Sequence, residues 1–118
     1  MSGAGDPGPI DEWPPAALEQ ALADRARHVV LLDVRMPGEF QQGSLPGALS
    51  MPLDEIDARH GELAPDAEVV CLCPDGERAA VAVVMLRALG HRHAALLAGG
   101  LRAVGIDTDG DSAEREAP

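Results

Sequence analysis

The sequence predicts an α/β protein: a three-layer α/β/α domain built around a mostly parallel central sheet of about five strands. Three short apolar runs are the main observation behind this prediction, and they cover residues 29–33, 69–73 and 94–98. The runs are continuous rather than alternating, which is typical of strands that are buried on both faces of a parallel sheet. Helical patterns separate them, and strands that alternate with helices indicate a sheet covered by helices on both faces.

Two shorter strands are expected to complete the sheet, one near residues 9–10 and one at residues 48–51. The first helix is predicted for residues 14–26, because prolines suit a first helical turn and apolar side chains then recur on one face. Asp11 is a possible N-cap of this helix. A short helix is predicted for residues 54–60.

The longest helix is predicted for residues 77–89, directly before Gly90. Its middle part, residues 81–86, is apolar all round, so we expect it to be buried by neighbours on several sides. A last helix is expected after the pair Gly99 and Gly100.

The composition indicates one acidic domain. The 118 residues include 20 acidic and nine basic residues, all of the latter arginine, which gives a net charge of -11. A chain this acidic lacks the basic surface that binds nucleic acid phosphates, and anionic membranes would repel it. No apolar run approaches the ~20 residues of a membrane-spanning helix. We therefore expect neither a nucleic acid nor a membrane as a partner.

The two ends of the chain differ from its middle. Residues 1–8 are rich in Gly and Pro and are expected to form a flexible N-terminus. Residues 107–118 carry five acids without an apolar pattern, so we expect an acidic disordered tail. The folded domain is therefore expected to span residues 9–106.

The cysteines and histidines do not form a metal-binding pattern. Only one residue separates Cys71 from Cys73, a spacing that strains a disulfide within one strand, so we expect a reducing, cytoplasmic compartment. Cys71 shares a strand face with Cys73 and is expected to pack in the core. His91 and His93 have no second half of a zinc site and are expected to lie in a solvated turn.

The junction of the strand at 69–73 with the long helix is the candidate site. Cys73 ends the strand, residues 74–77 form a tight loop, and Arg78 lies in the first helical turn. Ligands of parallel sheets bind at the carboxyl ends of strands, where loop N–H groups and a helix N-terminus attract anions. Such surroundings favour a nucleophilic thiolate. The alternative is a buried strand cysteine followed by an ordinary turn.

Taken together, the motifs resemble those of single-domain rhodaneses, a family with a sulfurtransferase fold. The matching pieces occur in the family's order and span residues 32–101, most of the predicted domain. They are Leu32-Asp33-Val34-Arg35, Glu39-Phe40, Gly43-Ser44-Leu45-Pro46-Gly47-Ala48, Met51-Pro52, Cys73-Pro74-Asp75-Gly76-Glu77-Arg78-Ala79, Leu86, Leu89, Gly90 and Leu97-Ala98-Gly99-Gly100-Leu101.

The resemblance implies an activity and a role for each loop residue. Cys73 would attack a sulfane sulfur, become a persulfide and pass the sulfur to an acceptor such as a thiol or cyanide. The loop residues would bind the substrate and stabilise its anionic states. The donor would be a small molecule or a protein, and no metal or organic cofactor is implied. The predicted loop residues are Pro74, Asp75, Gly76, Glu77 and Arg78.

The length of the loop separates this chain from related enzymes. Four residues lie between Cys73 and Arg78, whereas phosphatases and arsenate reductases of this fold have a loop one residue longer, which suits a tetrahedral oxyanion. The acidic residues Asp75 and Glu77 are unusual in a rhodanese loop. Asp75 could cap the helix, and the negative charge of Glu77 could stabilise the helix N-terminus, but both carboxylates would repel thiosulfate. We therefore expect weak thiosulfate:cyanide activity and a preference for a persulfide or a protein donor.

Other residues of the resemblance are given structural roles. We expect Arg35 to form an ion pair with Glu39 at i, i+4, and Asp33 to accept hydrogen bonds from loop N–H groups beside the site. Ser44 stands where the family usually has histidine, which we interpret as a minor packing change. A non-catalytic interaction or regulatory module of the same fold remains the alternative function, although such members usually lose the cysteine that is retained here as Cys73.

Overall fold

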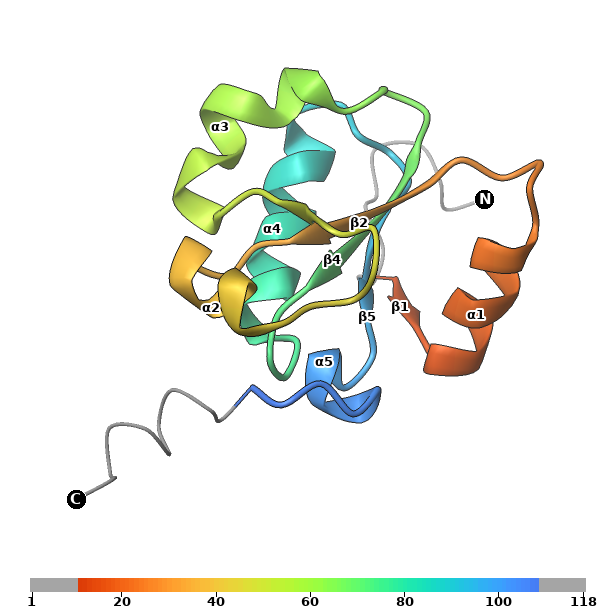
Figure 1. Ribbon diagram of the computed structural model, residues 1–118. Coiled ribbons are helices and arrows are strands. Elements are labelled where there is room, and N and C mark those ends of the chain that lie inside the picture. The colour runs from red at the N-terminus through yellow and green to blue at the C-terminus, as the bar shows by residue number, and fades with distance from the viewer. Residues whose placement is uncertain (1–10, 109–118) are drawn as a thin grey trace.

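A computed structural model describes residues 11–108 of the chain and shows a five-stranded, all-parallel sheet between two layers of helices (Figure 1). The order across the sheet is β1-β5-β4-β2-β3, so the longest strands lie at its centre. The predicted fold class is confirmed. The strands are β1 (Glu12–Trp13), β2 (Val29–Asp33), β3 (Leu49–Ser50), β4 (Glu68–Leu72) and β5 (Ala94–Leu97).

Helices α2, α3 and α4 cover one face of the sheet, and α1 and α5 cover the other (Figure 1). Two single 3₁₀ turns, η1 and η2, flank α3. The bounds are α1 (Pro15–Ala23), α2 (Pro37–Gln42), η1 (Leu53–Glu55), α3 (Ile56–Arg59), η2 (His60–Glu62), α4 (Glu77–Ala88) and α5 (Gly100–Ala103).

The central strands are apolar throughout because both of their faces are buried. Successive side chains of a strand point to opposite faces. Accordingly, Cys71 and Cys73 lie in the cluster under α4, whereas Val70 and Leu72 lie in the cluster under α1 and α5. Burial on both sides explains why β4 appears in the sequence as one continuous apolar run.

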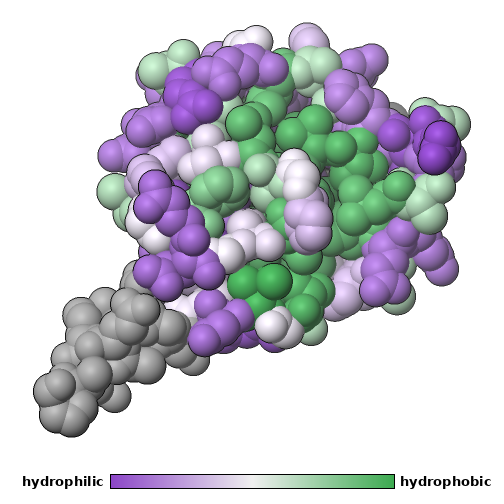
Figure 2. Space-filling view, in the orientation of Figure 1, coloured by the Kyte–Doolittle hydropathy of each residue, from purple (hydrophilic) through white to green (hydrophobic). Residues whose placement is uncertain are grey.

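The cluster under α1 and α5 has as its buried members Leu18, Leu31, Val70, Leu72, Leu97 and Leu101. Several hydrophobic residues around it are only partly buried. Figure 2 shows hydrophobic atoms that gather in one area of the surface, bordered by hydrophilic side chains. The partly buried residues are Trp13, Val29, Leu45, Ala48, Val104 and Ile106.

The strand expected near residues 9–10 falls on residues that are not described, the expected N-cap of the first helix is wrong, and one helix was not predicted. The first strand is β1, beyond residues 9–10, and those two residues lie outside the described part of the chain. Asp11 does not cap α1; its carboxylate pairs with Arg87 at 3.2 Å, and Pro14 occupies the N-cap position without a side-chain hydrogen bond. The six-residue α2 was not predicted, since it opens with Pro37 and has a single apolar anchor, Phe40.

The prediction that residues 81–86 are buried all round is wrong. Val81 is 49% exposed and Val84 is 56% exposed on the outer face of α4, while Ala82, Val83 and Leu86 face the core. Hydrophobicity alone did not show which face of α4 the fold leaves open. The expectations for residues 1–8 and for 109–118 of the tail fall outside the described residues, and Thr108 accepts a hydrogen bond from Arg102 Nε at 2.8 Å.

Candidate functional site

The thiol of Cys73 lies where β4 passes into α4. Its Sγ accepts hydrogen bonds from the Gly76 N–H at 3.0 Å and from the Ala79 N–H at 3.3 Å. The residue is completely buried. The N–H groups of the loop and of the first turn of α4 therefore reach the sulfur, as the sequence predicted, and they favour negative charge on it.

The acidic loop residue Asp75 has a structural role. Its Oδ1 accepts the Glu77 N–H at 3.1 Å, so it satisfies a donor at the start of α4 that no helical carbonyl can reach. Gly76 forms the N-cap position with φ of +104°, a conformation that favours glycine. The side chains of Asp75 and Glu77 are both exposed, so their charges lie on the surface of the loop.

The short helix α5 is hydrogen-bonded to the backbone of the loop. The Leu101 N–H donates to the Cys73 carbonyl at 2.8 Å, and the Arg102 N–H donates to the Pro74 carbonyl at 3.1 Å. This contact needs glycine at position 100, where a Cβ would lie only 2.6 Å from the carbonyl oxygen of Cys73. The Gly-Gly motif thus brings two segments of backbone together and fixes the path of the loop.

Arg78 forms a two-pronged ion pair with Glu39 of α2. Its two terminal nitrogens lie 2.7 and 2.9 Å from the two carboxylate oxygens. The Arg78 hydrogen bond is the main reason why the pKa of Glu39 falls to about 2, and the pKa of Arg78 is raised, first by Glu39 and to a smaller extent by Cys73. The predicted pair between Arg35 and Glu39 is therefore wrong, because Glu39 faces α4 instead.

Arg35 pairs with Asp33 in the interior of the protein. The guanidinium Nη2 lies 2.8 Å from Asp33 Oδ2 and also donates to the Gly43 carbonyl at 2.7 Å. Asp33 was expected to accept loop N–H groups; it accepts one, from Arg35 at 3.1 Å, and otherwise binds side chains. Ser44 is more than a packing change, since its hydroxyl donates to Asp33 Oδ2 at 2.7 Å. This network ties the end of β2 to the segment after α2.

Cys71 is buried in the core under α4, as predicted, and both cysteines are free thiols. Burial, and secondarily the charge that Cys73 can carry, raises the pKa of the Cys71 thiol far above its ordinary value. Cys71 therefore stays protonated and packs as an apolar side chain.

His91 is buried, which corrects the expectation of a solvated turn, whereas His93 is exposed. The ring of His91 meets the ring of His60, a residue to which the sequence drew no attention. Within residues 11–108, no three His, Cys, Asp or Glu side chains are close enough to hold a metal ion. The same residues contain no helix with the length and apolar character needed to cross a membrane.

The chain was compared with known proteins once this geometry was established. The rhodanese-like domain family matches residues 14–106. A sulfurtransferase of Allochromatium vinosum is 36% identical over 92 residues, which cover 78% of this chain and 85% of the relative. A tRNA uridine(34) hydroxylase of Xanthomonas euvesicatoria is 35% identical over 101 residues, but this match spans only 39% of that longer protein.

Solved structures of single-domain proteins agree with this assignment. A rhodanese-like domain protein from Staphylococcus aureus has a TM-score of 0.75 and 26% identity, with 83% of this chain and 94% of that chain covered. The human single-domain sulfurtransferase has a TM-score of 0.70 and 27% identity, with 82% and 96% covered. The matched family model and the relatives agree, and the chain belongs to the rhodanese-like domain family.

Proposed function

We propose that this protein is a sulfurtransferase that carries sulfane sulfur as a persulfide on Cys73. The observation that carries the proposal is the position of Cys73 Sγ within reach of the Gly76 and Ala79 N–H groups, at the N-terminus of the 12-residue helix α4. Backbone donors held in this way stabilise an anionic sulfur without any proton transfer. A reducing compartment such as the cytoplasm would keep Cys73 available as a thiol.

The proposed reaction has two displacement steps. The Cys73 thiolate attacks the sulfane sulfur of the donor, a new S–S bond forms, and the donor leaves with the electron pair of the bond that breaks. A thiol or cyanide acceptor then attacks the outer sulfur of the persulfide and takes it, which returns the thiolate. Because each step exchanges one anionic sulfur for another, the N–H groups of Gly76 and Ala79 serve both steps.

Access to the thiol depends on movement of its neighbours, since Cys73 has no exposed surface. The ion pair of Arg78 with Glu39 is the neighbour that separates at small cost, because the Arg78 side chain is 37% exposed and exposed ion pairs contribute little. We propose that an incoming donor displaces Glu39 and that Arg78 then helps to hold the donor. Pro74, Asp75 and Gly76 set the width of the loop around it.

The charges at the mouth of the loop favour one class of donor. The exposed carboxylates of Asp75 and Glu77 repel a doubly charged small molecule such as thiosulfate. A persulfide, or a protein whose surface is basic around its own persulfide, does not meet this repulsion to the same degree. We propose that such donors are preferred over thiosulfate.

Mass spectrometry of the intact protein tests the proposal. After incubation with polysulfide or glutathione persulfide, the wild-type protein should gain the mass of one sulfur atom, and reduction with a thiol should remove it. Cys73→Ser should show no gain, and the matched variant Cys71→Ala should retain it, since Cys71 stays protonated in the core. If folded wild-type protein gains no sulfur from polysulfide, glutathione persulfide or thiosulfate, a non-catalytic binding module becomes the better description.

A further inference from the structure

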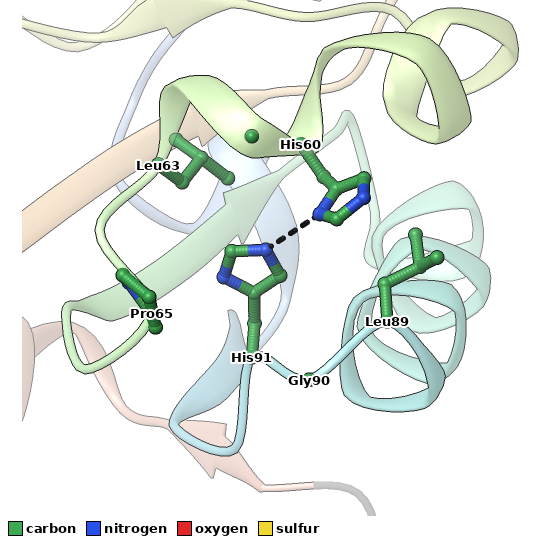
Figure 3. A pocket seen from close by; sticks show the side chains of 7 residues that line it. His60, Leu63, Pro65, Leu89, Gly90 and His91 are labelled. Carbon is green, nitrogen blue, oxygen red and sulfur yellow. Dashed lines mark hydrogen bonds between the residues drawn. The ribbon is translucent and has the colours of Figure 1, made fainter.

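Two histidines from different elements form a hydrogen-bonded pair at the end of the sheet opposite to Cys73. His60 Nδ1 and His91 Nε2 lie 3.0 Å apart, and the two rings meet edge to face at 86° (Figure 3). The ring centres are 5.2 Å apart, so the two nitrogens lie close to the line that joins them. This alignment suits one shared proton, and it leaves no room for a metal ion between the nitrogens.

The pair forms part of a pocket of about 270 Å³. Figure 3 shows the two rings between η2 and the turn that joins α4 to β5. This turn precedes β5 and the pocket residue Pro65 precedes β4, whereas Cys73 follows β4, so the pocket is separate from the candidate active site. The pocket is lined by His60, Gly61, Leu63, Pro65, Leu89, Gly90 and His91.

The two partners are attached to different helices. The His91 N–H donates to the Leu86 carbonyl at 2.9 Å, so His91 is attached to the last turn of α4, and its residue is only 3% exposed. His60 begins the single turn η2: its N–H donates to the Ile56 carbonyl of α3, and the Leu63 N–H donates to the His60 carbonyl at 3.0 Å. The hydrogen bond between the imidazoles therefore joins the segment formed by α3 and η2 to the end of α4.

The pair tolerates only one proton between its facing nitrogens. In the neutral pair, one ring donates an N–H and the other accepts it. If both rings were protonated, two N–H groups and two positive charges would face each other at 3.0 Å, and the hydrogen bond could not form. His91 Nδ1 is buried and has no hydrogen-bond partner among residues 11–108, so a proton on this nitrogen would lack an acceptor there.

The charged groups on the neighbouring elements do not compensate for a second charge. Arg59 of α3 binds Glu55 and Glu62, so the carboxylate of η2 is already engaged. At the ends of the strands, Arg87 of α4 pairs with Asp11, and Glu68 of β4 pairs with Arg27. Asp66, Arg92 and His93 are exposed to water. Burial first, and then the charge of His60, lower the pKa of His91, and a hydrogen bond with the His60 backbone acts in the opposite direction to a smaller extent.

We propose that the His60–His91 pair is an acid-sensitive latch that holds η2 on the turn between α4 and β5. While the pair shares one proton, the latch is closed and the pocket has the shape seen in the structure. A first extra proton on an outer nitrogen makes one ring cationic and leaves the hydrogen bond in place. Uptake of a second extra proton from water makes both rings cationic and breaks the hydrogen bond, and η2 then moves away from the turn while the sheet stays intact. The proposal concerns the end of the domain opposite to Cys73 and does not depend on the proposed sulfur transfer.

Hydrogen exchange of the full chain, read by mass spectrometry, tests the latch. Exchange in residues 59–65 is compared at about pH 7.5 and about pH 5, after correction for the chemical effect of pH on exchange. The wild-type protein should show extra opening of this segment at the lower pH. Opening should increase about tenfold per pH unit for each proton that the open segment binds beyond the closed pair, which is up to about a hundredfold where the closed pair is neutral. The amides of β4 should keep their protection.

Three variants make the test specific. His60→Gln can keep one hydrogen bond to His91 but cannot be protonated, so it should remove the acid response of residues 59–65. His60→Ala should leave the segment open at both pH values. His28→Gln replaces an exposed histidine outside the pair and should retain the response. The proposal is overturned if the response persists in His60→Gln, if wild-type protein shows none, or if β4 opens to the same extent.

Discussion

Arg78 and Glu39 hold each other through two parallel hydrogen bonds of 2.7 and 2.9 Å, although they lie 39 residues apart in the chain. The contact joins the first turn of α4, which starts beside Cys73, to α2. Glu39 also accepts the Met36 N–H at 3.0 Å, so the same carboxylate organises the start of α2. The positive charge of Arg78 is thus neutralised by Glu39, which the sequence analysis had paired with Arg35.

The variant Glu39→Gln tests whether this pair restricts access to the site. The neutral amide binds Arg78 less strongly, so Arg78 becomes available to an anionic donor. We expect the KM for thiosulfate to fall several-fold, while the free energy of unfolding falls by about 0.5–1 kcal/mol. Steady-state thiosulfate:cyanide kinetics measure the first effect. Glu55→Gln, which weakens an ion pair with Arg59 of α3, is the matched control and should leave KM unchanged. An unchanged KM in Glu39→Gln would contradict a gating role.

The same carboxylate should contribute to stability in a defined range of pH. Its pKa is about 2 in the folded protein, against an ordinary value of 4.5. A carboxyl whose pKa is lowered by folding stabilises the fold above its unfolded pKa, and this contribution disappears as pH falls from 4.5 toward about 2. The difference in unfolding free energy between wild type and Glu39→Gln should therefore shrink over that interval. Urea denaturation at a series of pH values measures it, and a difference that does not change with pH would argue against the lowered pKa.

The acidic residues of the loop should oppose thiosulfate. The double variant Asp75→Asn with Glu77→Gln keeps the shape of both side chains, and Asn can still accept the N–H of residue 77 that Asp75 binds at 3.1 Å. Its KM for thiosulfate should decrease several-fold at low salt, and less at high salt, because surface charges are screened. Asp66→Asn, a change at an exposed position before β4, serves as the control. An unchanged KM in the double variant would contradict the proposal that Asp75 and Glu77 repel thiosulfate.

Gly100→Ala should damage both the loop and the fold. The added Cβ would lie 2.6 Å from Asp75 N and from the Cys73 carbonyl oxygen, and Gly100 has φ of +70°. We expect a loss of about 2 kcal/mol or more in the free energy of unfolding, together with a loss of sulfur loading on Cys73. Thermal denaturation and mass spectrometry measure the two effects. Gly61→Ala places a Cβ in open space, so it should change the free energy of unfolding and the sulfur loading much less. Equal losses in the two variants would show that the close contact at Gly100 does not cause the effect.

Much of the fold could be predicted because its causes are local in the chain. The apolar runs at β2, β4 and β5 are continuous since each strand is buried on both faces, and the prediction of a parallel sheet follows from the helices between them. The short element α2 could not be found in this way. It has no repeating apolar face, and its position depends on Glu39 meeting Arg78 across the site.

The errors in the sequence analysis share one physical origin. The pair of Arg35 with Glu39 requires both residues on one helix, but α2 begins at Pro37, after Arg35. Val81 and Val84 are apolar, yet they are 49% and 56% exposed, and no element within residues 11–108 covers them. In each case the sequence shows the chemical character of the side chain but does not show which residues it contacts.

By itself, the sequence determined the sheet, the junction at which Cys73 follows a buried strand, and the loop whose N–H groups reach its sulfur. These features depend on neighbours along the chain, where strand, turn and helix signals follow one another. The tertiary structure alone decided that Arg78 binds Glu39 and that His60 meets His91, pairs separated by 39 and 31 residues. Such contacts form only when packing brings separate elements together, because the two atoms of an ion pair or of a hydrogen bond must lie within a few ångströms of each other.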